Sequence, residues 1–211
     1  MIKAEYISHM GSDTTVVNAA RVSFAKEVEG MDSKDAKLIE YLAKHNHWTP
    51  FSHPQIMIRE TVPIFVARQR FKHMVGFTYN EVSRRYVDDT PEFFYPEGWR
   101  SRPEGSAKQG SSSEFVEEND LTSTAYKKHI KNSVDLYNDM LYNGVAPEMA
   151  RMVLPQSMLT SYYVTGSLSA WARMVKQRTD DHAQVEIREL AKAVEYIIAS
   201  RFPISWEALT K

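Results

Sequence analysis

The sequence predicts a single mixed α/β domain that contains more helix than strand. Its 211 residues suit one domain better than two. Several segments carry apolar residues at helical spacing, whereas others alternate polar and apolar residues as half-buried strands do. Apolar residues make up 43% of the chain and charged residues 25%, which is ordinary globular usage. A chain of this length buries enough surface to form a core without disulfides.

The chain is expected to start with a strand and continue with a helix. Residues 3–8 alternate polar and apolar side chains before a Gly-Ser-Asp turn at 11–13, so they predict a strand. Residues 33–45 carry apolar side chains at helical spacing, with Ser33 as the expected N-cap. Pro50 ends this region, because a residue before proline is pushed out of the α conformation.

A second strand is expected over residues 55–62. There Ile56, Ile58 and Glu60 alternate with the side chains between them, which places these three on one face. The following segment, 63–73, begins with a proline that suits the first turn of a helix.

The second half of the chain is expected to be mainly helical. Residues 98–113 are rich in Gly, Ser and Pro, which predicts a flexible surface loop. A long helix follows and ends at the Asn-Gly pair 143–144. Its apolar stripe consists of Tyr126, Ile130, Val134, Tyr137 and Leu141. A short helix over 147–154, a strand over 158–166 and a helix over 167–178 complete this part.

The last segment is expected to be one amphipathic helix. Asp181, with Gln184 three residues later, resembles a capping box. The apolar side chains that share its buried face are Ile187, Leu190, Ala191, Val194, Ile197 and Ile198. Pro203 is expected to end this helix.

Composition excludes several classes of function. The chain has no cysteine, so disulfides, thiolate zinc sites, iron–sulfur clusters and cysteine nucleophiles are excluded. The formal net charge of −1 argues against a general nucleic-acid-binding surface. No apolar run reaches the roughly 18 residues of a membrane span, and the N-terminus lacks the apolar core of a signal peptide. We therefore expect a cytoplasmic protein with small-molecule ligands and without nucleic-acid or membrane partners.

The densest polar cluster lies between residues 68 and 85. Its cations, histidine and single carboxylate are Arg68, Arg70, Lys72, Arg84, Arg85, His73 and Glu81. Guanidinium groups match phosphate oxygens in a bidentate manner, so this composition suits an anionic ligand. A solvated helix face explains the same pattern equally well.

Two arginines and three histidines outside this cluster have structural explanations. Arg151 lies among apolar residues, where its stem packs beside a core, and Arg178 ends a predicted helix, where a cation is favourable. Either arginine could instead pair with an acid. His45, His47 and His53 match no metal-binding motif, so no metal site is expected.

Six sequence blocks occur in an order that matches one known family. They are AARVSF (19–24), LIEYLAKHNHWTPFSH (38–53), PIFVARQRFKH (63–73), YNEVSRRY (79–86), ARMVLP (150–155) and RTDDHAQVEIRELA (178–191). The fourth and sixth blocks are specific in combination. On these residues the chain resembles the flavin-dependent thymidylate synthases over nearly its whole length, apart from residues 98–113.

The resemblance implies a fold, a reaction and an assembly. The fold would be a single catalytic domain, residues 1–211, with a central sheet flanked by helices. The enzyme would convert dUMP to dTMP with methylenetetrahydrofolate as carbon donor and FAD, reduced by NADPH, as hydride donor. Members are homotetramers whose active sites form between subunits. The absence of cysteine fits this chemistry, which needs no thiolate nucleophile.

The resemblance also implies two sets of site residues. The dUMP set is Gln69, Lys72, Glu81, Val82, Ser83, Arg84, Arg85, Arg151 and Arg178. Arg178 is the implied catalytic residue, because a cation at the N3/O2 edge of uracil raises electron density at C5. The FAD set is Ser23, Thr49, Lys72, His73, Met74, Val75, Glu81, Arg173 and His182.

The flavin motifs depart from the family pattern at two places. The family's Arg-His-Arg is Lys72-His73-Met74 here, and Arg70 is expected to compensate for Met74 from the same helical face. Ser167, Ser169 and Arg173 stand where the family has an Asn-x-Arg pair and a later Asn. Two alternatives therefore remain beside the synthase: a dUMP-modifying enzyme with another product, such as hydroxymethyl-dUMP, and a non-catalytic nucleotide-binding homologue.

Overall fold

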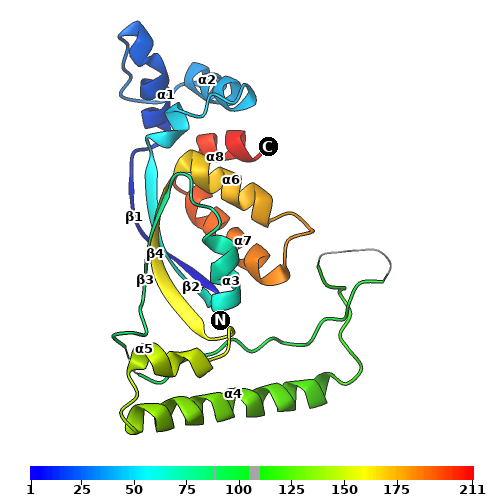
Figure 1. Ribbon diagram of the computed structural model, residues 1–211. Helices are drawn as coiled ribbons and strands as arrows, with labels where there is room; N and C mark the ends of the chain where they lie inside the picture. The colour runs from blue at the N-terminus through cyan, green and yellow to red at the C-terminus, as the bar shows by residue number, and fades with distance from the viewer. Residues whose placement is uncertain (88, 105–109) are drawn as a thin grey trace.

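The computed structural model describes residues 1–87, 89–104 and 110–211. Its described strands form one antiparallel sheet in the order β1-β2-β4-β3 (Figure 1). The strands are β1 (Lys3–Met10), β2 (Gln55–Pro63), β3 (Phe77–Glu81) and β4 (Leu159–Ser167). The mixed α/β class with a central sheet is therefore confirmed.

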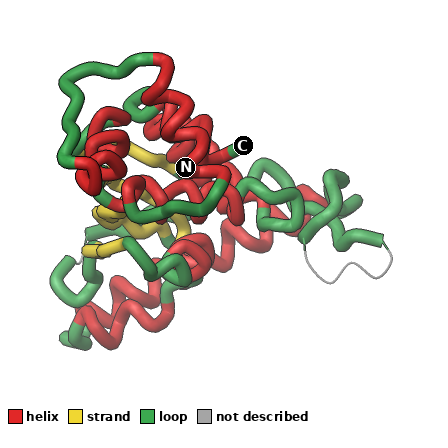
Figure 2. Tube along the Cα trace, turned by 90° about the horizontal axis from the view of Figure 1, so that it is seen from above, coloured by secondary structure: helices red, strands yellow, loops and turns green. Residues whose placement is uncertain are grey.

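Helices cover one face of this sheet. They are α3 (Ile64–Arg70), α6 (Leu168–Arg178) and α7 (Val185–Ala199), and each contacts at least one strand. Seen from above, the strands lie in the interior with helices around them (Figure 2). Every second residue of β2 and β4 is buried against them, including Ile56 and Ile58. The opposite face is partly exposed, because Arg59 and Tyr163 point away from the helices.

The remaining helices gather at the two ends of the sheet (Figure 1). At one end lie α1 (Asp13–Arg21), the 3-10 turn η1 (Val22–Phe24), α2 (Ser33–Lys44), the turn η2 (Pro50–Ser52) and α8 (Pro203–Thr210). At the other end lie α4 (Asn119–Tyr142), α5 (Pro147–Ala150) and the turn η3 (Arg151–Val153). The expected stripe of α4 is its less exposed face, with Ile130 and Tyr137 buried.

Several expected helix ends are wrong. Asp32, not Ser33, caps α2, because its carboxylate accepts from the amides of Lys34 and Asp35. Helix α3 ends at Arg70, three residues earlier than expected, because a tight turn follows. Pro63 is the last residue of β2 and the N-cap of α3, rather than part of its first turn.

The C-terminal segment differs from the expected single helix. Gln184 is the N-cap of α7, and Asp181 instead forms an ion pair with Arg188 at 3.2 Å. Pro203 does not close a helix but opens α8, whose backbone amides at Ile204 and Ser205 are bound by the Asp13 carboxylate. The N-terminal α1, β3 and α8 were not expected from the sequence.

The expected loop over 98–113 has neither helix nor strand in its described parts. Arg100 forms an isolated bridge with Phe115 and donates to Glu186 of α7 at 2.5 Å. Its expected flexibility stays a prediction, and residues 105–109 lie outside the described part. Within the described ranges, no helix has the length and apolar character that crossing a membrane requires.

Candidate active site

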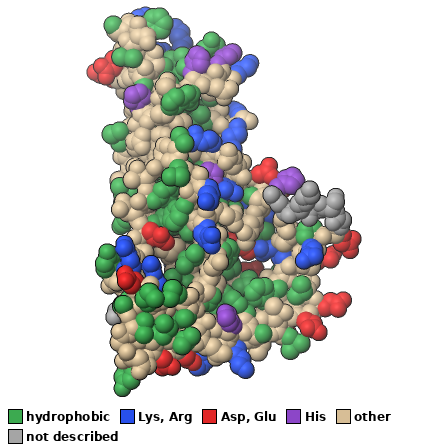
Figure 3. All heavy atoms as spheres, viewed as in Figure 1, with side chains coloured by type: hydrophobic (Ala, Val, Ile, Leu, Met, Phe, Trp, Pro, Cys, Tyr) green, Lys and Arg blue, Asp and Glu red, His purple; other side chains and the backbone are tan. Residues whose placement is uncertain are grey.

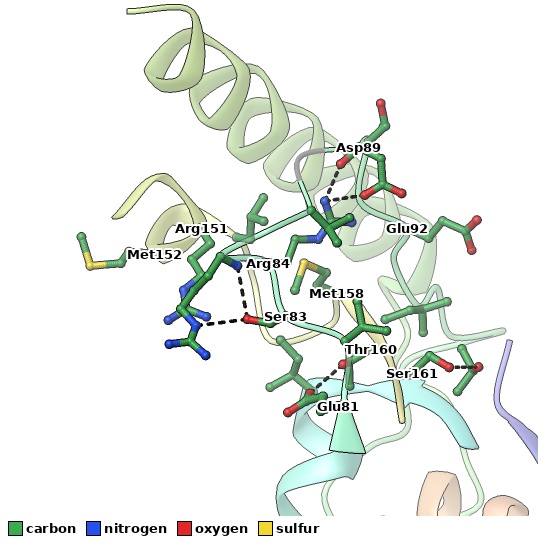
Figure 4. A pocket seen from close by; sticks show the side chains of 18 residues that line it. Glu81, Ser83, Arg84, Asp89, Glu92, Arg151, Met152, Met158, Thr160 and Ser161 are labelled. Atoms are coloured by element: carbon green, nitrogen blue, oxygen red, sulfur yellow. Dashed lines mark hydrogen bonds and ion pairs between the residues drawn. The ribbon is translucent and has the colours of Figure 1, made fainter. Parts of the chain in front are cut away.

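A cavity of about 790 Å³ lies where β3 ends beside the turn η3 (Figure 4). Its wall includes six residues of the expected dUMP set: Glu81, Val82, Ser83, Arg84, Arg85 and Arg151. The family blocks YNEVSRRY and ARMVLP, about 70 residues apart along the chain, therefore meet at one cavity. Antiparallel pairing of β3 with β4 carries the end of β3 toward the start of β4, which follows η3 directly.

The cations of this cavity differ in their partners. Arg84 forms an ion pair with Asp89 at 2.9 Å and also donates to its carbonyl. Arg85 donates through Nε to the Ser83 hydroxyl at 3.2 Å, and Arg151 donates through Nε to the carbonyl of Glu148 at 3.2 Å. Among the described residues, no carboxylate lies within ion-pair distance of either Arg85 or Arg151. Figure 4 shows Arg151 and Ser83 on the same side of the cavity.

The carboxylate of Glu81 is held at the edge of the sheet. Thr160 of β4 donates to it at 2.6 Å, so the side chain has a fixed position on the wall. Thr160 was not expected as a site residue. Its position across from the end of β3 depends on strand register, which the sequence does not show.

A second group centres on the contact between His73 and Arg178. The His73 side chain accepts through Nε2 from Arg178 Nε at 2.8 Å, and Arg178 Nη2 donates to the carbonyl of Gln69 at 3.3 Å. Burial, followed by the charges of Arg178, Arg70 and Arg173, lowers the pKa of His73 to about 4. The imidazole is therefore neutral at pH 7, which is the form that can accept from Arg178. Burial, and then Arg70, also lower the pKa of Arg178.

A third group lies at the start of β3, around the N-terminus of α6. Arg173 donates to the carbonyl of Val75 at 2.6 Å. Both residues line a cavity of about 240 Å³, with Trp48 and Ser169 also on its wall. It shares Trp48, Ser169 and Arg173 with a neighbouring cavity of about 460 Å³. Thr49 follows Trp48 and is exposed.

The third group offers the chemistry that a flavin dinucleotide requires. Arg173 and the exposed Lys72 are cations for a diphosphate, and Trp48 is an aromatic side chain that is 64% exposed. The neutral His73 adds a hydrogen-bonding ring beside them. In Figure 3, Lys and Arg side chains form a series through the middle of one molecular face, with hydrophobic side chains between them. The residues present therefore fit such a cofactor.

The expected sets do not all meet within this single chain. Val75, of the FAD set, lies before β3, and Val82, of the dUMP set, lies after it. The five residues of β3 between them span about 17 Å at about 3.3 Å per residue. Ser23 lies in η1, and His182 is exposed and bound to Asp180 at 2.9 Å. Met74 is 73% exposed. Gln69 donates through its side-chain amide to Gln184 at 2.6 Å.

Arg70 does not take the expected role of replacing the cation that Met74 lacks. Its side chain is completely buried and donates through Nε to both carboxylate oxygens of Glu60 at 3.1 Å. A guanidinium in this position faces the core rather than a ligand. One feature of the sequence could have predicted the pair of Glu60 and Arg70. Glu60 shares the buried face of its strand with Ile56 and Ile58, and a buried carboxylate favours a cation beside it.

Comparison with known proteins identifies the family. Residues 5–204 match the family model described as thymidylate synthase complementing protein. A flavin-dependent thymidylate synthase from Thermosipho africanus is 36% identical over 205 residues, which cover 97% of this chain and 89% of that protein. Its counterpart from Thermus thermophilus is 37% identical, with 96% of this chain and 73% of that protein covered.

A solved structure agrees with this assignment. The UMP/dUMP methylase PolB from Streptomyces cacaoi, bound with 5-Br dUMP, superposes with a TM-score of 0.87 at 28% identity. The match covers 100% of this chain and 95% of PolB. A second PolB structure contains 5-Br UMP and superposes equally well, with a TM-score of 0.87. The chain therefore belongs to the flavin-dependent thymidylate synthase family of methyltransferases.

Proposed function

We propose that the protein is a thymidylate synthase that converts dUMP to dTMP, with methylenetetrahydrofolate as carbon donor and NADPH as the source of electrons. The observation that carries this proposal is the convergence of Arg85, Arg151 and Ser83 on one cavity, where no carboxylate of the described residues forms an ion pair with either arginine. Cavities of several hundred Å³ with a few convergent polar groups are typical small-molecule sites.

The phosphate of dUMP binds at this cationic wall. The guanidinium groups of Arg85 and Arg151 each offer N–H donors in a planar fork, which suits phosphate oxygens. The Ser83 hydroxyl, already held by Arg85, adds a further donor. Arg84 contributes less to phosphate binding because Asp89 offsets its charge.

Arg178 activates the pyrimidine. Its Nε is occupied by the neutral His73, so the plane of the guanidinium is fixed before substrate binds. Held at the N3/O2 edge of uracil, this cation stabilises negative charge on the ring and raises electron density at C5. Such preorganised charge replaces the cysteine nucleophile that the chain lacks.

The cofactor is FAD, which supplies the hydride when it is bound and reduced. Lys72, His73, Val75 and Arg173 hold it in this proposal, and the set carried over from the family also contains Thr49, Glu81 and Met74. Ser23 and His182 belong to the same set, but Ser23 lies in η1 and His182 in the segment between α6 and α7, and both are exposed. This separation supports a homotetramer in which neighbouring subunits complete each site.

An activity assay tests the proposed function. Purified protein with FAD, dUMP, methylenetetrahydrofolate and NADPH is expected to form dTMP, identified by mass. A parallel reaction with UMP tests the wider specificity that the name of the PolB methylase indicates. A protein that forms no methylated nucleotide under reducing conditions would refute the proposal.

The two alternatives give different results in the same experiment. A product with the mass of hydroxymethyl-dUMP would show that water reaches the carbon-transfer intermediate. A protein that stays colourless after FAD is added, yet binds dUMP, would be a non-catalytic homologue.

A further inference from the structure

The turn between α3 and β3 is held by side chains from other elements. Two of its backbone carbonyls accept such bonds: His73 from Tyr79 at 2.6 Å, and Val75 from Arg173 at 2.6 Å. The carbonyl of Gln69, in the last turn of α3, accepts from Arg178 at 3.3 Å. Two of these donors are arginines of α6, whereas Tyr79 comes from β3. The turn that carries His73 is therefore fixed from both sides.

Tyr79 is itself held by a completely buried ion pair. Arg70 donates through Nη1 to the Tyr79 hydroxyl oxygen at 2.5 Å and through Nε to Glu60 at 3.1 Å. The Arg70 guanidinium also lies 4.4 Å from the centroid of the Phe77 ring and 4.9 Å from that of Trp171. Arg70 and Glu60 are both 0% exposed.

The ion pair between Arg70 and Glu60 determines which group the Tyr79 hydroxyl donates its proton to. Because the hydroxyl oxygen accepts from Arg70, its single proton is available for the His73 carbonyl, which is 0.8 Å nearer than the carbonyl of Arg70 (2.6 against 3.4 Å). Burial raises the pKa of Tyr79 to about 12, so the donor keeps its proton at pH 7. A buried Arg–Glu pair seldom adds net stability over apolar side chains of similar volume, so a second role is needed to explain it.

We propose that Tyr79, backed by the buried Arg70–Glu60 pair, is a positioning residue that fixes the main chain at His73 and through it the Arg178 guanidinium. The inference rests on the proposed function for the role of Arg178, but the geometry at His73 is independent of that role. A connected series of bonds runs from Glu60 in β2 to Arg178 in α6.

The charges around His73 explain why its position matters. Arg178 and Arg173 face it from α6 and Arg70 from α3, with Glu60 of β2 behind Arg70 and the Tyr79 hydroxyl beside it. With the ring held in this place, its neutral form accepts from Arg178. A ring released toward water would regain an ordinary pKa near 6.5, bind a proton and repel Arg178.

Tyr79→Phe removes only the hydroxyl and is the test variant. Its matched control is Tyr126→Phe, which removes a partly buried hydroxyl of α4 that donates to the carbonyl of Phe94 at 2.7 Å and not to His73. For Tyr79→Phe we expect kcat to fall by about 10-fold to about 100-fold, and further as the pH falls from 8 to 6. The control is expected to lose similar thermal stability while kcat and its pH profile stay unchanged.

NMR titration of the His73 ring gives a readout that does not depend on turnover. In the wild-type protein the ring is expected to stay neutral from pH 8 to pH 5, whereas in Tyr79→Phe it titrates nearer 6.5. The proposal is overturned if the ring of Tyr79→Phe titrates as in the wild type, or if kcat falls no more than in Tyr126→Phe. A wild-type protein without synthase activity would refute the proposed function and leave the titration as the test of positioning.

Discussion

Removing the Glu60 carboxylate leaves a buried arginine without a counter-charge, and its cost can be worked from the structure. Both side chains of the Glu60–Arg70 pair are 0% exposed, and Arg70 Nε donates to both carboxylate oxygens at 3.1 Å. Breaking such a pair costs about 3–5 kcal/mol, because the remaining ion stays desolvated. For a domain of this size we expect Glu60→Gln to lower Tm by about 10 °C.

A double variant separates the cost of an orphaned charge from the net value of the pair. Glu60→Leu combined with Arg70→Met replaces both ions with apolar side chains, and such replacements range from neutral to stabilising by about 1–4 kcal/mol. The combined variant is therefore expected to be at least as stable as the wild type. The coupling free energy from the double-mutant cycle reports how strongly the two residues depend on each other.

A surface ion pair on the same strand provides the control. Arg59 of β2 donates to the Glu5 carboxylate of β1 through Nη2 at 2.9 Å and through Nε at 3.0 Å, yet the two side chains are each 44% exposed. Glu5→Gln is expected to destabilise the protein far less than Glu60→Gln, because water screens the charges of an exposed pair. Urea unfolding followed by circular dichroism, at one protein concentration, measures these three variants, the single variants Glu60→Leu and Arg70→Met that complete the cycle, and the wild type. The reasoning is refuted if Glu60→Gln costs no more than Glu5→Gln, or if the double variant is as unstable as the single ones.

Four further changes test the site and the fold. Arg178→Ala is expected to lower kcat by about 10²–10³-fold with an unchanged circular dichroism spectrum, because it removes charge stabilisation in the transition state; near-normal turnover would contradict that role. Arg151→Ala is expected to weaken dUMP binding, measured calorimetrically, by about 10-fold to about 100-fold through loss of a charge-assisted phosphate contact, whereas Lys131→Ala, which removes an exposed cation of α4 that is paired with Asp135, leaves affinity unchanged. Asp32→Ala removes two bonds to the first amides of α2 and is expected to lower the urea concentration at the unfolding midpoint; no change in that midpoint would argue against the cap. The pKa of His73 is about 4 in the folded state and near 6.5 in the unfolded state, so the unfolded state binds a proton first as the pH falls. This group therefore lowers stability between pH 6.5 and pH 4 and has no effect above pH 6.5. A His73→Gln protein should show a shallower decline of Tm over that range, and a decline identical to that of the wild type would count against the assignment.

The strands and the longer helices were predictable from spacing, whereas β3 was not. Alternation in β2 placed Ile58 and Glu60 on one face, and the structure buries both. Strand β3 has only five residues and lies inside the cationic segment 68–85. The charges of that segment suggested a ligand site and not the edge of a sheet. Helix α8 was missed because Pro203 was taken as a terminator, although proline is equally suited to the first turn of a helix.

The candidate site was predictable as a set of residues but not as a geometry. Sequence blocks identified Ser83, Arg85 and Arg151, which share one cavity. Which cations are neutralised depends on side chains brought together by folding, as Asp89 is beside Arg84. Spacing suggested that Arg70 could reach a ligand on the helical surface, whereas tertiary packing against Glu60 turns it into the core.

An anaerobic single-turnover reaction tests most directly whether reduced, bound flavin supplies the electrons that complete the methylation. Protein loaded with FAD and chemically reduced is mixed with dUMP and methylenetetrahydrofolate in the absence of NADPH and oxygen. We expect one dTMP to form for each flavin that is reoxidised, followed by absorbance and by product mass. Flavin that stays reduced while dUMP is recovered unchanged, or dTMP formed without flavin oxidation, would contradict the account.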